Sequence, residues 1–139
     1  MCGHRLGHDG QGAAGSRRGE ARCGAATGGA GMSDDICEVI ITAPDTDWLA
    51  AFTRQLVEER LAACGHFIQT VRSIYRWGGA VHDETEARVA IHTRTSLVPI
   101  LTARAQRDHP YDVPCVIAAP IIDGNPAYLR WVFDETQPV

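Results

Sequence analysis

Two long stretches of strand-forming sequence meet at a pair of glycines, and this arrangement constrains the fold more than any other feature of the 139-residue chain. Residues 66–77 (HFIQTVRSIYRW) are rich in aromatic and β-branched side chains, which favour strands. Gly78 and Gly79 follow and are typical of a hairpin turn. Residues 80–94 (AVHDETEARVAIHTR) then alternate with a period of two. Both strands exceed the usual length of about five or six residues. We therefore predict a hairpin that extends beyond a small domain and whose far end must be covered by another surface.

The alternation within residues 80–94 predicts one dry and one polar face for the second strand of the hairpin. The predicted dry face carries Val81, Thr85, Ala87, Val89, Ile91 and Thr93. The predicted polar face carries His82, Glu84, Glu86, Arg88, His92 and Arg94. Such a strand is expected to cover the core with one side only.

The remaining elements follow from local signals. Residues 36–42 and 115–121 are short apolar runs typical of buried strands. A helix is predicted from a cap at Asp45 or Thr46 to about Ala63, and a second from a Thr or Ser cap at 95–96, through Pro99 in its first turn, to about Asp108. Asn125 and Pro126 begin a short last helix. With right-handed crossovers, the order βαββαβ plus a C-terminal helix predicts an α+β, ferredoxin-like sandwich.

Residues 1–31 differ in composition from the rest of the chain. They hold ten of the fourteen glycines and almost no large apolar side chains. Such a segment buries too little surface to offset its conformational entropy, so we predict a disordered N-terminal tail and a single domain over residues 32–139. Met32 is interpreted as the more natural start, and the tail lacks the apolar core of a secretory signal.

Composition also excludes several functions. The chain has no lysine, which rules out a Schiff-base or P-loop lysine within it. Residues 32–139 carry nine Arg against fifteen Asp or Glu, an acidic balance that disfavours nucleic-acid binding. No apolar run reaches about 18 residues, so no membrane span is expected. Cys37, Cys64 and Cys115 are far apart without a C-x-x-C pair, which predicts reduced thiols in a cytoplasmic protein and no structural zinc site.

Five short motifs together resemble the CutA family of divalent-cation tolerance proteins. They are TAPD after the first strand, LAAC after the first helix, SIYRWGG in the hairpin, ETE in its second strand, and HPYDVP before the last strand. The resemblance covers about residues 36–133. It implies a homotrimer in which the long hairpins of neighbouring subunits pair edge to edge, and copper or another divalent cation as a weakly bound ligand.

The resemblance also implies where a ligand binds. Tyr75, Trp77, Tyr111 and Trp131 match aromatic positions of the family, and Tyr111 is expected in a cleft between subunits, held between Pro110 and Pro114. The copper positions of the family correspond to Ile41 and to Asp108–His109. Because Ile41 cannot ligate and Asp108 is a harder ligand than histidine, His109 and Asp108 are expected to bind copper only weakly.

Other polar residues offer alternatives. Cys64 and His66 form a conceivable nucleophile pair, but no third orienting group is evident from the sequence. His82 and His92 are interpreted as solvent or interface residues. Glu84 and Glu86 lie on one strand face and suit a hard cation, acid–base work or, as the favoured interpretation, an ion pair with an arginine of a neighbouring chain.

Three classes of function remain open. The favoured class is a trimeric metal- or small-ligand-binding protein without catalysis. The alternatives are a PII-like protein that senses a small ligand, and an enzyme that uses the cleft between subunits. The sequence shows no nucleophile with its base, no phosphate loop and no complete metal triad, which favours the first class.

Overall fold

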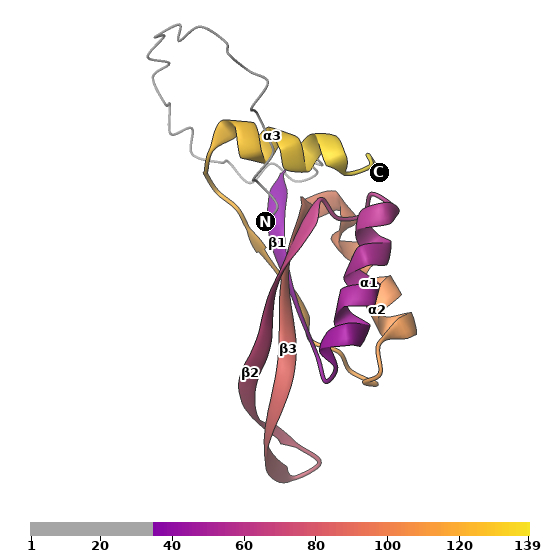
Figure 1. The fold of residues 1–139 in the computed structure, drawn as a ribbon, viewed down its shortest axis with the longest axis vertical. Helices are drawn as coiled ribbons and strands as arrows, with labels where there is room; N and C mark the ends of the chain where they lie inside the picture. Colours follow the sequence, from indigo (N-terminus) through magenta and orange to yellow (C-terminus); the bar gives the residue numbers. More distant parts are fainter. Residues whose placement is uncertain (1–34) are drawn as a thin grey trace, which may run out of the picture.

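A computed structural model describes residues 35–139, which form one antiparallel sheet with three helices (Figure 1). The predicted disordered tail, residues 1–31, lies outside the described residues. The elements are β1 (Ile36–Ala43), α1 (Thr46–Glu58), β2 (Cys64–Trp77), β3 (Ala80–Arg94), α2 (Val98–Asp108), β4 (Val116–Pro120) and α3 (Pro126–Glu135). The strand order is β2-β3-β1-β4. This is the predicted α+β, ferredoxin-like sandwich with an additional C-terminal helix.

The main core lies between one face of the sheet and the helices α1 and α2, which both lie on the same side of the sheet in Figure 1. The dry face of β3 enters this core at Ala87 and continues through Val89, Ile91 and Thr93, all buried. Leu49, Leu56 and Leu101 from the two helices are fully buried against the sheet. The opposite face of the sheet is free of α1 and α2, and the polar side chains of β3 lie there.

The hairpin of β2 and β3 extends well past the ends of α1 and α2 in Figure 1. Val81 and Thr85 were predicted on the dry face but are exposed, because they lie beyond the helices that would cover them. Ile74 and Trp77 are also more than half exposed. Gly78 and Gly79 both have positive φ angles, of 60° and 79°, as the predicted tight turn requires.

The ends of the helices follow their capping groups. Asp45 accepts a hydrogen bond from the backbone N–H of Asp47, and Asn125 accepts one from Ala127, as predicted for both caps. The prediction that α1 continues to Ala63 was wrong. The helix ends at Glu58, because Arg60 adopts a positive φ of 60° and reverses the chain. The second helix is preceded by a 3₁₀ turn over 95–97 and lacks the predicted Ser or Thr side-chain cap.

A β-bulge interrupts the pairing of β2 with β3. Ile68 pairs with Arg88, but the next pair is Val71 with Glu86, so β2 advances three residues while β3 advances two. The extra residue reverses the parity of β2. Even-numbered residues of β2 share a face with even-numbered residues of β3 before the bulge, and odd-numbered residues of β2 do so after it. Cys64 and Tyr75 therefore face the same side of the sheet.

The last helix crosses the end of the sheet, near the start of β1 (Figure 1). Val132 of α3 packs against Ile36 and Ala63. The buried guanidinium group of Arg94 donates hydrogen bonds of 2.7 Å and 2.8 Å to the backbone oxygens of Phe133 and Thr136. A cation at these carbonyl oxygens opposes the negative end of the helix dipole, so Arg94 holds the end of α3 on the sheet. None of the helices in residues 35–139 has the length and apolar character needed to cross a membrane.

Candidate metal centre and a neighbouring cavity

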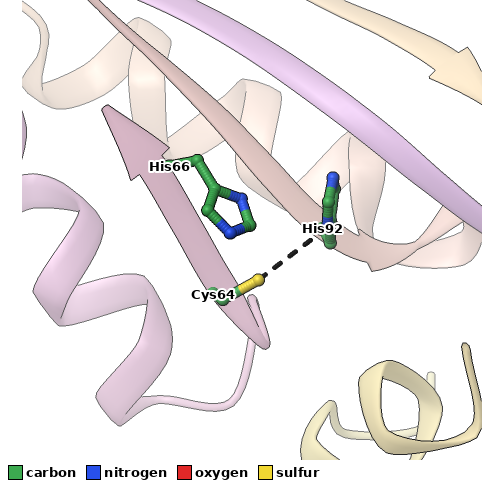
Figure 2. Close-up of side chains that lie close together, drawn as sticks. All are labelled: Cys64, His66 and His92. Atoms are coloured by element: carbon green, nitrogen blue, oxygen red, sulfur yellow. Dashed lines mark hydrogen bonds between the residues drawn. The ribbon is translucent and has the colours of Figure 1, made fainter. Parts of the chain in front are cut away.

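A thiol and two imidazoles meet at the end of the sheet nearest α3. Cys64 and His66 project from the first residues of β2 toward His92 on β3 (Figure 2). One ligand atom from each of the three residues lies within 4.8 Å of the others. Glu38, the cross-strand partner of His92 on β1, extends this row. We call Cys64, His66 and His92 the Cys–His cluster.

Close packing behind β2 fixes the position of the cluster. A Cβ atom at Gly65 would lie only 2.6 Å from Cγ2 of Thr53 on α1, so glycine lets the strand approach the helix between the two ligands. The backbone N–H of Ala63 donates a 2.9 Å hydrogen bond to the carbonyl oxygen of His92. Together these contacts set Cys64 opposite His92 on the outer face of the sheet.

Hydrogen bonds orient the His92 ring with a nitrogen toward the thiol. Nε2 of His92 lies 2.8 Å from a carboxylate oxygen of Glu38. Because a carboxylate accepts a hydrogen bond, the ring proton belongs on Nε2 and the lone pair on Nδ1. Nδ1 lies 3.8 Å from the sulfur of Cys64 and 2.5 Å from the hydroxyl oxygen of Tyr128. Carboxylate–histidine pairs of this kind commonly orient metal ligands.

Tyr128 closes the cluster from α3. Its hydroxyl oxygen is also 3.3 Å from the sulfur of Cys64, so it contacts two of the three ligand residues. With the Nδ1 lone pair of His92 facing it, the hydroxyl group donates to that nitrogen. A cation bound at Nδ1 would take the place of this proton. The cluster and the end of α3 are thus directly linked.

His66 is the exposed member of the cluster. Desolvation, and then the nearby His92 ring, lower the pKa of His66 below the ordinary histidine value. The ring is therefore neutral near pH 7 and offers a lone pair for coordination. Cys64 is 4% exposed, so its thiol has little contact with solvent.

One thiolate and two imidazoles are a donor set for borderline metal ions such as Zn²⁺ or copper. Zinc bonds of about 2.3 Å to sulfur and about 2.0 Å to nitrogen place ligand atoms roughly 3.5 Å apart. Side-chain movements of about 1 Å would close the observed spacing to that value. Three protein ligands leave a fourth position for water or another group, which permits exchange of the ion.

Sequence reasoning found part of this cluster and missed the rest. It singled out Cys64 and His66 but found no orienting group, and it interpreted His92 as a solvent or interface residue. Without a bulge, the turn pair Trp77–Ala80 would set Cys64 opposite Thr93 and place His92 on the other face from the thiol. The bulge at 68–71 shifts that register by one residue. Predicting that Cys64 lies opposite His92 therefore required the register of the whole hairpin, including the bulge.

The predicted metal ligands at the end of α2 are already engaged. Nε2 of His109 donates to the carbonyl oxygen of Thr42 at 2.8 Å, and Nδ1 accepts the backbone N–H of Tyr111 at 2.9 Å. Both ring nitrogens of this buried histidine are thus committed to the backbone. The carboxylate of Asp108 receives two hydrogen bonds from Arg107, which holds the pKa of Asp108 below its usual range. This geometry is that of a structural turn and does not support the predicted copper site.

Three of the four predicted aromatic residues do come together. Tyr75, Trp77 and Tyr111 line a cavity of about 650 Å³ on the outer face of the hairpin. Its wall also includes Glu84, Glu86 and Asp112, followed by Thr42, Ser73, Pro110, Val113 and Cys115. We call this the aromatic–carboxylate cavity. Trp131 does not line it in the chain itself; its ring packs 5.7 Å from that of Tyr128.

Carboxylates dominate the electrostatics of this cavity. The hydroxyl group of Tyr75 donates a 2.7 Å hydrogen bond to Glu84, which raises the pKa of Tyr75 to about 12. Burial, and then the charges of Glu86 and Glu84, raise the pKa of Tyr111. Both phenols therefore remain protonated at neutral pH, so neither ring carries a negative charge. Glu86 is only 7% exposed.

With the fold and both sites described, comparison with known proteins places the chain. The family model for the CutA1 divalent ion tolerance protein matches residues 37–135. The divalent-cation tolerance protein CutA of Thermus thermophilus is 41% identical over 98 residues, which are 70% of this chain and 95% of that protein. Protein CutA of Mus musculus is 39% identical over 114 residues, 82% of this chain and 64% of that protein.

Solved structures agree. A divalent cation tolerance protein (Cut A1) from Thermus thermophilus matches with a TM-score of 0.71 and 39% identity, covering 73% of this chain and 99% of that structure. CutA1 from Oryza sativa matches with a TM-score of 0.72 and 36% identity, covering 74% and 94%. The chain thus spans less than two thirds of the mouse relative but almost all of these structures. The chain belongs to the CutA1 family of divalent ion tolerance proteins.

Proposed function

We propose that this protein serves divalent-cation tolerance by reversible binding of one borderline divalent cation per chain at the Cys–His cluster, without catalysis. The observation that carries this proposal is the convergence of Cys64, His66 and His92 within 4.8 Å, with Glu38 behind the His92 ring. A thiolate and two neutral imidazoles favour Zn²⁺ or copper over Mg²⁺ or Ca²⁺, which prefer oxygen ligands. The open fourth position suits uptake and release more than permanent structural binding.

The second part of the proposal is that the chain works as a homotrimer in the cytoplasm. The hairpin and β4 carry exposed apolar side chains, with Ile74 65%, Val81 63% and Ile117 61% exposed. The outer edges of β2 and β4 are also unpaired within the sheet of the described chain, and strand edges of this kind invite pairing with another chain. Residues 35–139 contain no disulfide, which suits a reducing compartment. A mass in solution three times that of one chain would support the assembly.

Calorimetric titration of the full chain with Zn²⁺ tests the metal site. We expect one Zn²⁺ per chain, and Cys64→Ser should weaken binding at least a hundredfold because it removes the only sulfur ligand of the cluster. Cys115→Ser is the matched control, since Cys115 is exposed and outside the cluster. It should bind zinc like the parent.

Two further measurements test whether groups outside the Cys–His cluster bind the ion. Cys2 and Cys23 lie outside the described residues, so a chain with both changed to serine should retain the single strong site. Co²⁺ should give sulfur-to-metal charge-transfer absorption that Cys64→Ser abolishes. Equal zinc affinity in the Cys64→Ser and Cys115→Ser proteins, or no binding by the parent, would refute the proposal.

A second candidate function is thiol-based chemistry at Cys64. The carboxylate of Glu38, the ring of His92 and the thiol of Cys64 are arranged like the orienting acid, the base and the nucleophile of a cysteine hydrolase. The 3.8 Å separation and the burial of the thiol place this candidate second. Rapid alkylation of Cys64 by iodoacetamide at pH 7, unaffected by Zn²⁺, would favour it over metal binding.

A further inference from the structure

The aromatic–carboxylate cavity is lined by one mostly buried acidic residue, Glu86. The side chain of Glu86 has no hydrogen bond or ion pair to any group of residues 35–139, although only 7% of the residue is exposed. Removing a carboxylate from water costs several kcal/mol unless a donor or cation replaces the lost hydration. The Glu86 oxygens are not among the fully buried side-chain atoms without a partner in residues 35–139, so they keep contact with solvent through the cavity and are open to a cation or donor group that enters it.

The lining contains nothing that neutralises Glu86. Within the described chain, three carboxylates line the cavity and no Arg, Lys or His does. Arg88, two residues along the same face of β3, forms no hydrogen bond or ion pair with Glu86 within residues 35–139, and Arg72, on the opposite face of the sheet, forms a bidentate pair with Asp83 at 2.8 Å and 2.6 Å. Glu84 already accepts the hydroxyl proton of Tyr75. Glu86 and Asp112 therefore remain available to an incoming group, and of these two Glu86 is the buried residue.

The aromatic walls select for a flat or diffuse cation. Tyr75, Trp77 and Tyr111 all border the space beside Glu86, and both phenols stay protonated because nearby carboxylates raise their pKa values. The faces of neutral aromatic rings attract organic cations, most strongly where water is excluded. A guanidinium group satisfies both features, because it stacks on rings and binds a carboxylate through two N–H groups.

We propose that the aromatic–carboxylate cavity binds an alkylguanidinium group, with Glu86 as its counter-ion and the rings of Tyr75, Trp77 and Tyr111 as its walls. The site is separate from the Cys–His cluster. Glu86 and His92 lie six positions apart on β3, which is about 20 Å along a strand. The group has two possible sources with the same chemistry: a free small molecule, or an arginine side chain of a second copy of this chain. A cavity of about 650 Å³ is of the size that holds small ligands.

Titration of the full chain with ethylguanidinium, followed by tryptophan fluorescence and calorimetry, tests the proposal. We expect saturable binding that Glu86→Gln weakens at least tenfold, while zinc affinity stays that of the parent. Glu135→Gln removes the same charge from an exposed position far along the chain and should leave ethylguanidinium binding unchanged. Ethylurea, the neutral analogue, should not bind.

The mass in solution distinguishes the two sources. If the group is a free ligand, Glu86→Gln leaves the mass unchanged. If it is an arginine of a second copy, Glu86→Gln or a high concentration of ethylguanidinium lowers the mass. That result also supports the binding of a guanidinium group at Glu86. The proposal is overturned if Glu86→Gln changes neither probe affinity nor mass, if ethylurea binds as well, or if Mg²⁺ or Ca²⁺ saturates Glu86 where ethylguanidinium does not.

Discussion

The Cys–His cluster and the aromatic–carboxylate cavity lie on the same polar face of β3, yet they are built in opposite ways. In the cluster, the carboxylate of Glu38 lies behind His92 and turns a lone pair inward. In the cavity, the carboxylate of Glu86 itself faces inward, among rings. The first arrangement presents neutral nitrogen and sulfur atoms to a metal ion. The second presents a formal charge and flat walls to an organic cation.

The comparison shows that the position of a carboxylate relative to a ring decides what a site can bind. Glu38 and Glu84 each hydrogen-bond a ring group, His92 and Tyr75 respectively. The imidazole of His92 still has a second nitrogen that can bind a metal ion. The phenol of Tyr75 has no second metal-binding atom, so its uncharged ring forms part of the cavity wall. Composition alone would not separate the two sites, because each combines a tyrosine with a glutamate.

Lowering the pH should separate the two sites most strongly. Zinc binds the thiolate and neutral imidazoles, so binding at the cluster releases protons and should weaken about tenfold for each pH unit below 8. Because the pKa of His66 is lowered, protonation of this ring should compete only below the ordinary histidine value of about 6.5, and the loss should become steeper there. Calorimetry between pH 8 and pH 5.5 measures this slope.

Ethylguanidinium stays a cation throughout this range, so its binding is the comparison for zinc. Its affinity should depend on pH less steeply than the zinc affinity. A zinc affinity that depends on pH no more steeply would show that neither the thiol nor His66 coordinates the ion.

Removing Glu38 should weaken the cluster and leave the cavity intact. Partners behind metal-ligating histidines typically contribute about tenfold to a hundredfold in metal affinity, so we expect a zinc affinity lower by that factor in Glu38→Ala. Glu38→Gln should restore part of it, because the amide oxygen still accepts the Nε2–H of His92. Competition with a chromogenic chelator gives the values. An unchanged zinc affinity in Glu38→Ala would mean that Glu38 does not position the ring.

The smallest expected effect is at Tyr75. Glu84→Gln removes both the charged acceptor and the repulsion of a phenolate, so the pKa of Tyr75 should fall from about 12 toward the ordinary tyrosine value. Ultraviolet absorbance during an alkaline titration measures it, with Tyr75→Phe to identify the transition. Zinc affinity should not change. A change would show that the two sites are coupled through β3.

The parts of the fold that depend on local chemistry were predicted from the sequence. Asp45 and Asn125 cap their helices, and Gly78–Gly79 forms the hairpin turn, because each signal acts within a few residues. Long-range geometry was not predictable in the same way. Nδ1 of His109 accepts from Tyr111, two residues away, but Nε2 is engaged by Thr42, which lies 67 residues away in the sequence. No residue pattern near 109 carries that information.

The candidate sites also differ in how much of them could be predicted from the sequence. Tyr75, Trp77 and Tyr111 were grouped by resemblance to a family, and they share a cavity in the chain. The pairing of Cys64 with His92 depends on one extra residue in β2, which packing across the sheet determines. An unbroken alternation placed His92 correctly on the polar face but could not show which β2 residues meet it there.

That extra residue also determines where this hairpin can change in length among related chains. Deleting either residue 69 or residue 70 would remove the bulge and keep the cross-strand pairs on both sides of it, so Cys64 would still lie opposite His92 and Tyr75 opposite His82. A deletion nearer the turn could be absorbed at the same place, but the residues between the two points would change face. Relatives with a second strand one residue shorter should therefore keep both sites and lack a residue at 69–70.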